Sequence, residues 1–457
     1  MSQVHGTAAS TEEAQGEVIA KKLIGVRQLI LNRPKRLNAL NLNMIKTIIP
    51  KILSWNGSGL ANIITLKGNG RALCAGGDVR SVVEAAKAKA PNTSEYFSTE
   101  YQLNHLVSAL DTPYVSIMDG ITMGGGIGIS VHAPFRIATE NTVFAMPETA
   151  IGLFPDVGGS FFLPRLDGQL GIYLGLTGAR LSAEDVLFAG IATHFVPSSR
   201  LEALETRLSE IESSDHDIIN TAIEEFAADH DPEVQFSLGG ETRKAIDRYV
   251  MYSHLSLRLR CFKFNTVEEI FAALDKEKSE WAAKTKAHML ELSPTSLKIT
   301  LQQLRIGAKR SIADCFKMEY KLAEKIVFSS EFHEGVTAKL INRTQPKWNP
   351  ATLSEISNDS ILKTYFEAPG ENQLTLLSPK DYMQYPYRKY ALPTEEDIRR
   401  VVTGDAADAI LSHPISGDDI TNWFVRERHG KFGVHEKVRE VLQRKTKLEG
   451  DVLRWIY

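Results

Sequence analysis

Two glycine-rich segments constrain the fold of this chain more than any other feature of its sequence. Ala75-Gly76-Gly77-Asp78 follows a buried-strand pattern at 63–66, and Gly124-Gly125-Gly126 follows another at 113–118. Each segment precedes a helical pattern and therefore predicts a helix N-terminus with unpaired backbone N–H groups. Glycine lets a ligand approach such a backbone closely, so two converging ends could hold an oxyanion. On spacing alone, ordinary tight turns explain both segments equally well.

The remaining patterns indicate an α/β fold whose ligand-binding loops follow strand ends. Strand patterns occur at 18–33, 63–66, 113–118, 135–138 and 142–145. A helix is expected to start at Asn41, where apolar residues begin to recur at helical spacing. Ser182-Ala183-Glu184-Asp185 has the form of a capping box that opens a further helix. Helical patterns dominate from about 200 to 345.

Composition argues against several classes of protein. A formal charge of -3 provides no global attraction for a polyanion, and no apolar run approaches the ~20 residues of a membrane helix. The three cysteines lie far apart without CxxC spacing, and the 12 histidines show no HExxH spacing. We therefore expect a soluble protein of a reducing compartment, with no metal and no membrane contact.

Two carboxylates, Glu148 and Asp156, occur in apolar, proline- and glycine-rich surroundings. Glutamate in such a setting is usually solvated or salt-bridged. If it is buried, its pKa rises, which suits a base or nucleophile that works near neutral pH. The pattern alone leaves both interpretations open.

Four motifs identify a family once they are taken together. They are the segment from Asn32 to Leu40 (NRPKRLNAL), CAGGD at 74–78, YVxxxxGxxMGGGxG and FAMPExxIGxxPDxGG. In order and spacing they resemble the crotonase superfamily over roughly 18–345. The resemblance implies an α/β fold of the crotonase ββα-superhelix type, an acyl-CoA substrate, and an oxyanion hole formed by the backbone N–H groups of Gly77 and Gly125. It further implies CoA contacts at Lys35, Arg36, Leu37, Ala75, Gly76 and Asp78.

Individual residues point to one branch of this superfamily. Enoyl-CoA hydratases carry two glutamates that handle water; one matches Glu148, but Gly128 stands at the position of the other. The combination of Gly128, Glu148, Asp156 and Glu100 resembles the 3-hydroxyisobutyryl-CoA hydrolases. That resemblance implies thioester hydrolysis in valine catabolism, in mitochondria, with no cofactor beyond the CoA of the substrate. The N-terminus shows no transit peptide, so either the protein is cytosolic or a targeting segment lies outside this sequence.

The resemblance also implies roles for the acidic residues. Glu148 attacks the carbonyl or activates water, and the sequence does not separate the two. Asp156 orients water or bonds the 3-hydroxyl of the substrate, and Glu100 is a second contact to that hydroxyl. The alternative for Glu100 is a solvated helix residue. Cys74, although it lies inside a motif, is expected to be a small buried filler rather than a nucleophile.

The resemblance ends near residue 350, and we divide the chain accordingly. The expected parts are an N-terminal extension (1–17), a crotonase core with the CoA and catalytic sites (18–200), a helical region that completes the hydrolase (201–349) and a C-terminal extension (350–457). The extension starts with an expected linker at 346–359.

The C-terminal extension is expected to carry a basic amphipathic helix at about 434–448. Between Arg426 and Lys447 there are eight Lys or Arg residues against three Glu. Such a helix either packs on its own domain or docks on RNA or a large assembly. Fungal relatives with such tails resemble a subunit of the mitochondrial small ribosomal subunit that kept the hydrolase fold. Ribosomal RNA and proteins are therefore the alternative partners, and the extension is expected to be dispensable for hydrolysis.

Overall fold

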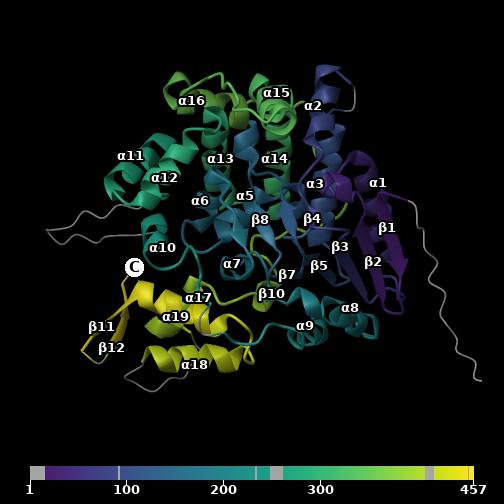
Figure 1. Ribbon diagram of the computed structural model, residues 1–457, viewed down its shortest axis with the longest axis vertical. Coiled ribbons are helices and arrows are strands. Elements are labelled where there is room, and N and C mark those ends of the chain that lie inside the picture. Colours follow the sequence, from purple (N-terminus) through teal and green to yellow (C-terminus); the bar gives the residue numbers. More distant parts are fainter. Residues whose placement is uncertain are drawn as a thin grey trace, which may run out of the picture.

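Two β-sheets lie side by side at the centre of the computed structural model, which describes residues 16–90, 93–231, 234–247, 261–406, 416–450 and 452–456 (Figure 1). The larger sheet has the strand order β1-β2-β3-β5-β7-β10, and the smaller has the order β4-β6-β8-β9. The strands of the larger sheet are β1 (Val18–Lys22), β2 (Val26–Leu31), β3 (Ile63–Gly68), β5 (Tyr114–Met118), β7 (Phe135–Ala138) and β10 (His194–Phe195). Those of the smaller are β4 (Ala72–Cys74), β6 (Ile121–Met123), β8 (Val143–Ala145) and β9 (Leu181–Ser182).

Three consecutive pairs of strands each contribute one strand to either sheet. The pairs are β3 with β4, β5 with β6, and β7 with β8, and helical segments follow them. The central strands run parallel, so β4 and β6 end at the same edge of the smaller sheet. This repeat is the expected ββα superhelix, and the expected α/β class is confirmed. It brings the two glycine-rich segments together, because they follow neighbouring strands.

The helices follow the expected periodicity. α1 (Leu42–Trp55) begins where the side chain of its N-cap Asn41 accepts a hydrogen bond from the Met44 N–H, and it buries Ile45 and Ile52 against the sheet. The other helices of the first half are α2 (Val79–Lys87), α3 (Glu95–Ser108), α4 (Gly125–Gly128), α5 (Gly159–Phe162), α6 (Leu170–Thr177), α7 (Glu184–Phe188), α8 (Leu201–Ser209) and α9 (His216–Glu224). Next come α10 (Gly240–Asp247), α11 (Val267–Glu277), α12 (Glu280–Met289), α13 (Pro294–Gly307), α14 (Ile312–Ile326) and α15 (Ser330–Val336).

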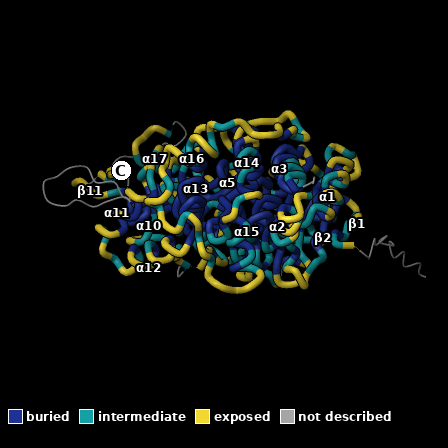
Figure 2. The backbone as a smooth tube through the Cα atoms, turned by 90° about the horizontal axis from the view of Figure 1, so that it is seen from above, coloured by how far each residue is buried: buried dark blue, intermediate teal, exposed yellow. Residues whose placement is uncertain are grey.

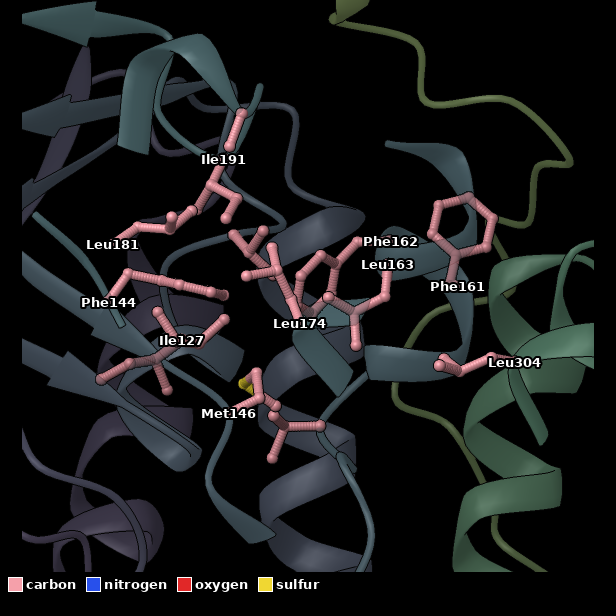
Figure 3. Close-up of a cluster of buried hydrophobic side chains, with 14 of the residues drawn as sticks. Ile127, Phe144, Met146, Phe161, Phe162, Leu163, Leu174, Leu181, Ile191 and Leu304 are labelled. Atoms are coloured by element: carbon pink, nitrogen blue, oxygen red, sulfur yellow. The ribbon is translucent and has the colours of Figure 1, made fainter. Parts of the chain in front are cut away.

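The main core contains side chains from both sheets and from the helices packed on them. Figure 3 shows apolar side chains of this core gathered from strands and helices: Ile127, Phe144, Met146, Phe161, Phe162, Leu163, Leu174, Leu181, Ile191 and Leu304. Burial of such side chains is the dominant favourable contribution to folding. Seen from above, buried residues form a continuous band through the molecule with exposed residues around it (Figure 2).

The expected capping box at 182–185 is wrong. Ser182 belongs to β9, and α7 begins after Ala183, whose side chain offers no cap. The Asp185 carboxylate instead accepts hydrogen bonds from the backbone N–H and the hydroxyl of Ser237. A tertiary partner has therefore replaced the local bond that the motif predicts.

The expected linker at 346–359 is largely irregular and contains no buried residue, but the chain on either side of it is packed. The elements here are η5 (Thr337–Asn342), η6 (Leu353–Glu355), α16 (Asn358–Ile361), η7 (Leu362–Glu367) and η8 (Arg388–Tyr390), and α16 and η7 pack on α13 and α14. The buried Lys298 donates to the Ile356 carbonyl at 2.7 Å, and Lys321 donates to the Phe366 carbonyl at 2.6 Å. Chain 350–390 therefore forms a strap over the hydrolase-like part.

The tail consists of α17 (Glu395–Thr403), α18 (Gly417–Glu427), α19 (Val434–Lys445) and the hairpin β11 (Thr446–Glu449) with β12 (Val452–Trp455). The expected basic helix is present as α19, which packs on α18, α17 and α10 (Figure 1). Among the described residues, no helix is both long and apolar enough to cross a membrane.

A buried network of charges joins the tail to α10. Its cations are Arg243, Lys437, Arg444 and Lys445, and its anions are Asp167, Asp247, Glu395 and Glu440. Glu395 is 3.0 Å from the Arg243 guanidinium and 3.3 Å from the Lys445 amine, while Lys437 is 2.7 Å from Asp167. Three basic residues of α19 are thus occupied inside the protein, as the packed interpretation of this helix requires.

Candidate active site

The backbone N–H groups of Gly77 and Gly125 lie close together above the ends of β4 and β6. A Cβ added to Gly125 would be 3.2 Å from the Gly77 nitrogen and would collide with Glu100 Oε1. Within the described ranges, no hydrogen bond uses either N–H. Two free donors at one point form a site for an oxyanion, and any side chain at Gly125 would fill it. The geometry therefore matches the role predicted for both glycines.

The two segments predicted to contact CoA lie against each other. Ala75 N–H donates to the Leu37 carbonyl at 3.0 Å, and Leu40 N–H donates to the Gly76 carbonyl at 2.9 Å. Lys35 and Arg36 are exposed beside this junction in the helical turn η1 (Pro34–Arg36). The Asp78 carboxylate pairs with Arg33 at 3.0 Å, so its charge is neutralised within the protein. Asp78 therefore fastens the two segments together.

Three buried carboxylates surround the oxyanion site. Glu100, Glu148 and Asp156 line one cavity of about 240 Å³ together with Gly77 and Gly125. Each is at most 5% exposed, and among the described residues no basic side chain forms an ion pair with any of them. The structure thus collects every residue predicted to act on the thioester in one place.

Glu148 lies at the start of η2 (Glu148–Ile151), where Pro147 precedes it. Its Oε1 would be 2.9 Å from a Cβ on Gly124, and its Oε2 is buried without a hydrogen-bond partner among the described residues. Burial raises the pKa of the Glu148 carboxyl well above its usual value, and the charge of Asp156 raises it further. A carboxylate in this setting is a strong base with one oxygen available to react.

Asp156 is held by a tyrosine that the sequence did not single out. The Tyr101 hydroxyl donates to Asp156 Oδ2 at 2.9 Å. Burial raises the pKa of Asp156 to about 7, although the bond from Tyr101 lowers it. Near neutral pH Asp156 can therefore either donate or accept a proton.

Glu100 lies on α3 at 2% exposure, so the interpretation of a solvated helix residue is wrong. Its Oε1 has no hydrogen-bond partner among the described residues and faces Gly125. Burial raises the pKa of Glu100 well above its usual value, and the charge of Asp156 adds to the effect. Tyr96, one turn earlier, lies beside Gly77 and donates to the Leu40 carbonyl at 3.2 Å.

Glu319 of α14 holds the loop that carries Asp156 through hydrogen bonds. Glu319 accepts hydrogen bonds from the Gly158 and Ser160 N–H groups at 2.7 and 2.8 Å. On the other side, the His132 ring bonds the Val157 carbonyl at 2.8 Å. Val157 has a φ of 52°, a backbone conformation that β-branched residues avoid. The surrounding contacts hold this strained loop in place, and no local motif identified them.

The strap reaches the same loop through His132. The Tyr385 hydroxyl donates to the His132 carbonyl at 2.8 Å, and the His105 ring bonds the Lys380 carbonyl at 3.0 Å. Residues beyond 350 therefore support the scaffold of Asp156. This contact argues against the expectation that everything after 350 is dispensable for catalysis.

Gly128 lies where no larger side chain fits. A Cβ there would be 2.9 Å from both amide atoms of Asn104 and would be closer still to Val157. Asn104 is fully buried, and neither amide atom has a hydrogen-bond partner within the described residues. The space that a carboxylate at 128 would need is therefore filled.

A short helical segment contributes to the wall of the cavity. Lys339 and Leu340 of η5 line it, and the Arg80 guanidinium of α2 donates to the Leu340 carbonyl. No feature of the sequence indicated this part of the wall. Cys74, in contrast, is fully buried, and burial raises the pKa of its thiol to about 12, so the expected filler role is confirmed.

Comparisons with known proteins agree with this geometry. The family described as enoyl-CoA hydratase/isomerase matches residues 26–366. The human protein named 3-hydroxyisobutyryl-CoA hydrolase, mitochondrial, is 44% identical over 79% of this chain and 91% of its own length. A Neurospora crassa protein named small ribosomal subunit protein mS47 is 45% identical over 94% of this chain and 85% of its own.

Solved structures show the same fold. A carnitinyl-CoA dehydratase from Mycobacterium thermoresistibile aligns with a TM-score of 0.71 at 34% identity, over 80% of this chain and 100% of its own. An enoyl-CoA hydratase from Rhodobacter sphaeroides aligns with a TM-score of 0.67 at 29% identity, over 79% of this chain and 100% of its own.

Proposed function

The chain belongs to the enoyl-CoA hydratase/isomerase family, and we propose that it hydrolyses short 3-hydroxyacyl-CoA thioesters, with 3-hydroxyisobutyryl-CoA as its substrate. The observation that carries this proposal is the group of three buried carboxylates facing two free glycine N–H groups. The human relative and its chicken counterpart are named as mitochondrial hydrolases of this thioester. We accordingly assign the protein to mitochondria and to valine breakdown.

The reaction starts with the thioester carbonyl at the oxyanion site. Its oxygen accepts hydrogen bonds from Gly77 and Gly125 N–H, and the same bonds strengthen as negative charge develops on that oxygen. Loss of one such donor costs other enzymes about 3–4 kcal/mol of transition-state stabilisation. The donors are backbone groups held by two strand ends, so they need no reorganisation during the reaction.

Glu148 supplies the electron pair, either by attacking the carbonyl carbon or by taking a proton from the attacking water. Collapse of the tetrahedral intermediate breaks the C–S bond and releases the CoA thiolate, which takes up a proton. The overall balance is one thioester and one water to one acid and one thiol. In the nucleophilic route a mixed anhydride between Glu148 and the acyl group remains after the thiol leaves, and a water molecule hydrolyses it to the acid and free Glu148. A single turnover in H₂¹⁸O tests for this anhydride: label in Glu148 requires it, whereas label in the product alone fits direct attack by water or attack of water on the acyl carbon of the anhydride.

Enoyl-CoA hydratases use a second glutamate at the position of Gly128 for hydration of a double bond, and this chain has no carboxylate at that position. Gly128 cannot be given a carboxylate without displacing Asn104 or Val157. We expect purified protein to release thiol from 3-hydroxyisobutyryl-CoA, measured with a thiol reagent, and to leave crotonyl-CoA almost unchanged. Hydration of crotonyl-CoA at a rate equal to thioester hydrolysis would refute the assignment.

Asp156 gives the proposal a test of substrate class. A site built to bond a hydroxyl loses its preference when its partner is removed. Asp156→Asn should therefore slow hydrolysis of 3-hydroxyisobutyryl-CoA more than that of isobutyryl-CoA. Equal losses on the two substrates would place Asp156 in the handling of water instead.

A second candidate function is association with the mitochondrial small ribosomal subunit. The Neurospora relative is named as a small ribosomal subunit protein, and its similarity spans 94% of this chain, well beyond the 79% matched by the human hydrolase. Half of the eight basic residues at 426–447, however, form buried ion pairs: Lys431, Lys437, Arg444 and Lys445. Docking through charge would depend on the exposed ones, which are Arg426, Arg439 and Lys447.

Co-sedimentation with mitochondrial small subunits over a range of salt concentrations tests this association. The full chain is compared with the double variant Arg426→Glu/Arg439→Glu, because these changes leave the buried network intact. Electrostatic docking predicts binding that falls steeply with salt and is weakened in the variant. Absence of co-sedimentation even at low salt would remove this function without touching the hydrolase proposal.

A further inference from the structure

Two histidines and a glutamate gather outside the catalytic site, at the junction of the tail with the body. His230 lies in the segment that follows α9, while His435 and Glu436 lie in the first turn of α19. His230 Nδ1 is 2.9 Å from Glu436 Oε1, and His435 Nδ1 is 3.3 Å from the same oxygen. One donor atom from each of the three residues lies within 4.8 Å of the others.

These separations fit a shared metal ion. Zn²⁺ binds imidazole nitrogen and carboxylate oxygen at about 2.0–2.1 Å, and two such ligands at a tetrahedral angle are roughly 3.3 Å apart. The observed nitrogen–oxygen distances are close to that value. His₂Glu with a fourth, water-filled position is a ligand set that binds zinc in catalytic sites, so three ligands of this kind suffice to hold the ion.

The Glu436 carboxylate is incompletely satisfied without an ion. Its side chain is 10% exposed, and Oε2 is buried without a hydrogen-bond partner among the described residues. For both imidazole contacts to be hydrogen bonds, His230 and His435 must both carry a proton on Nδ1 and direct it at one oxygen. A cation bound by the two Nδ1 atoms and Oε1 removes the need for two protons directed at one oxygen and leaves both rings neutral.

The surroundings permit a cation and a water molecule. Lys437 and Arg444, which lie nearby on α19, are neutralised by Asp167 and by Glu395 with Glu440. A cavity of about 650 Å³, lined in part by His435 and Glu436, opens beside the cluster and admits solvent to a fourth position.

We propose that His230, His435 and Glu436 form a Zn²⁺ site with one open, water-filled position, and that the bound ion fastens the tail to the body of the protein. The segment before His230 is itself anchored to the larger sheet, since Ala228 N–H donates to the Phe195 carbonyl at the end of β10. An ion here joins that sheet to α19. His230 lies far from His435 and Glu436 in the sequence, so no short metal-binding motif indicates the site.

The proposal is tested on the full, tag-free chain after dialysis against a chelator. Titration with Zn²⁺ should show one binding site per chain, and Co²⁺ in its place should give the visible absorption bands of a tetrahedral ion. Bound Zn²⁺ should raise the unfolding temperature by a few degrees, because an ion that binds only the folded state stabilises it.

Glu436→Gln and His230→Ala should each weaken Zn²⁺ binding at least tenfold and abolish the rise in unfolding temperature. His429→Asn is the matched control, since His429 is an exposed tail histidine outside the cluster and asparagine tolerates its φ of 51°. The control should bind Zn²⁺ like the natural chain. Failure of the natural chain to bind Zn²⁺, or equal binding by Glu436→Gln, would overturn the proposal. Thioesterase activity does not enter the readout.

Discussion

Buried charge is arranged in opposite ways at the catalytic cavity and at the seam between body and tail. At the cavity, Glu100, Glu148 and Asp156 are buried together, and no basic side chain of the described residues pairs with them. At the seam, four buried or nearly buried cations face four anions. Both regions are well shielded from water. They differ in whether the buried carboxylates have cationic partners, and not in how deeply they are buried.

The pKa values show how neighbouring cations change a buried carboxylate. Burial raises the pKa of Glu148 and Asp156 because a charged carboxylate loses its hydration. Burial acts on Glu395 in the same direction, but the charges of Arg243 and Arg444 outweigh it and hold the pKa of Glu395 far below its usual value. A buried carboxylate without a nearby cation is a reactive base, and it lowers the stability of the folded protein. A buried carboxylate that is paired with cations is unreactive, and the folded protein depends on it to neutralise those cations.

The largest effect is expected from Glu148→Gln. The amide keeps the shape of the side chain but cannot act as base or nucleophile, so kcat should fall by about 10²–10⁴-fold. The free energy of unfolding should stay the same or rise, since a buried uncompensated acid is removed. Thiol release and urea denaturation measure the two quantities. A variant that keeps its activity would take Glu148 out of the mechanism.

Glu395→Gln should show the reverse pattern. It removes one of the two anions that Arg243 and Arg444 share and leaves Asp247 as the other. The loss of stability should therefore be large, but at most about 3–5 kcal/mol, which is what breaking a buried pair costs. The catalytic carboxylates are untouched, so the folded fraction should retain its kcat. Glu396→Gln is the matched control, because Glu396 is the exposed neighbour in the same helix. Equal unfolding free energies for the two variants would contradict the role of the network.

The two regions should also respond to pH with opposite signs. The pKa of Asp156 is raised from 3.8 to about 7, so its contribution to stability is present at low pH and is lost as pH rises through about 7. The pKa of Glu395 is lowered, so its contribution is present above its unfolded value near 4.5 and is lost on acidification. Unfolding measured between pH 4 and 8 should show a shallower first slope in Asp156→Asn, because Glu100 and Glu148, whose pKa values are also raised, still contribute to it. An unchanged slope in that variant would show that another group titrates.

The smallest effect is expected at an exposed ion pair of the tail. Arg399 lies 2.8 Å from Glu396, and the Glu396 side chain is 62% exposed. Exposed pairs contribute little because water screens them, so Arg399→Ala should change the unfolding free energy by about 0.5 kcal/mol or less. Thermal denaturation of Arg399→Ala and of Glu395→Gln compares the stability lost at an exposed and at a buried ion pair within one helix. A loss as large as that of Glu395→Gln would mean that charge matters here regardless of burial.

Much of the fold follows from local pattern, and the exceptions have a common cause. The strands at 63–66, 113–118 and 135–138 and the start of α1 at Asn41 were predicted because hydrophobic periodicity and capping act within a few residues. The capping box at 182–185 failed because Ser237, far along the chain, binds Asp185. The expected linker at 346–359 contains no buried residue, but the buried Lys298 of the body binds the Ile356 carbonyl, a contact that no local pattern predicts.

At the candidate active site, the sequence by itself predicted the groups proposed to react. Gly77, Gly125, Glu148 and Asp156 lie in motifs with characteristic spacing, and Glu100 entered by resemblance alone. Only the tertiary structure decided their environment. Tyr101 and Glu319 act on Asp156 and its loop, and both are remote from it in the chain. The basic helix 434–445 shows the same division. Its charge follows from the sequence, but its buried ion-pair partners are known only from the structure. Burial and pairing depend on which segments meet in space, and that is a property of the packed chain rather than of any one segment.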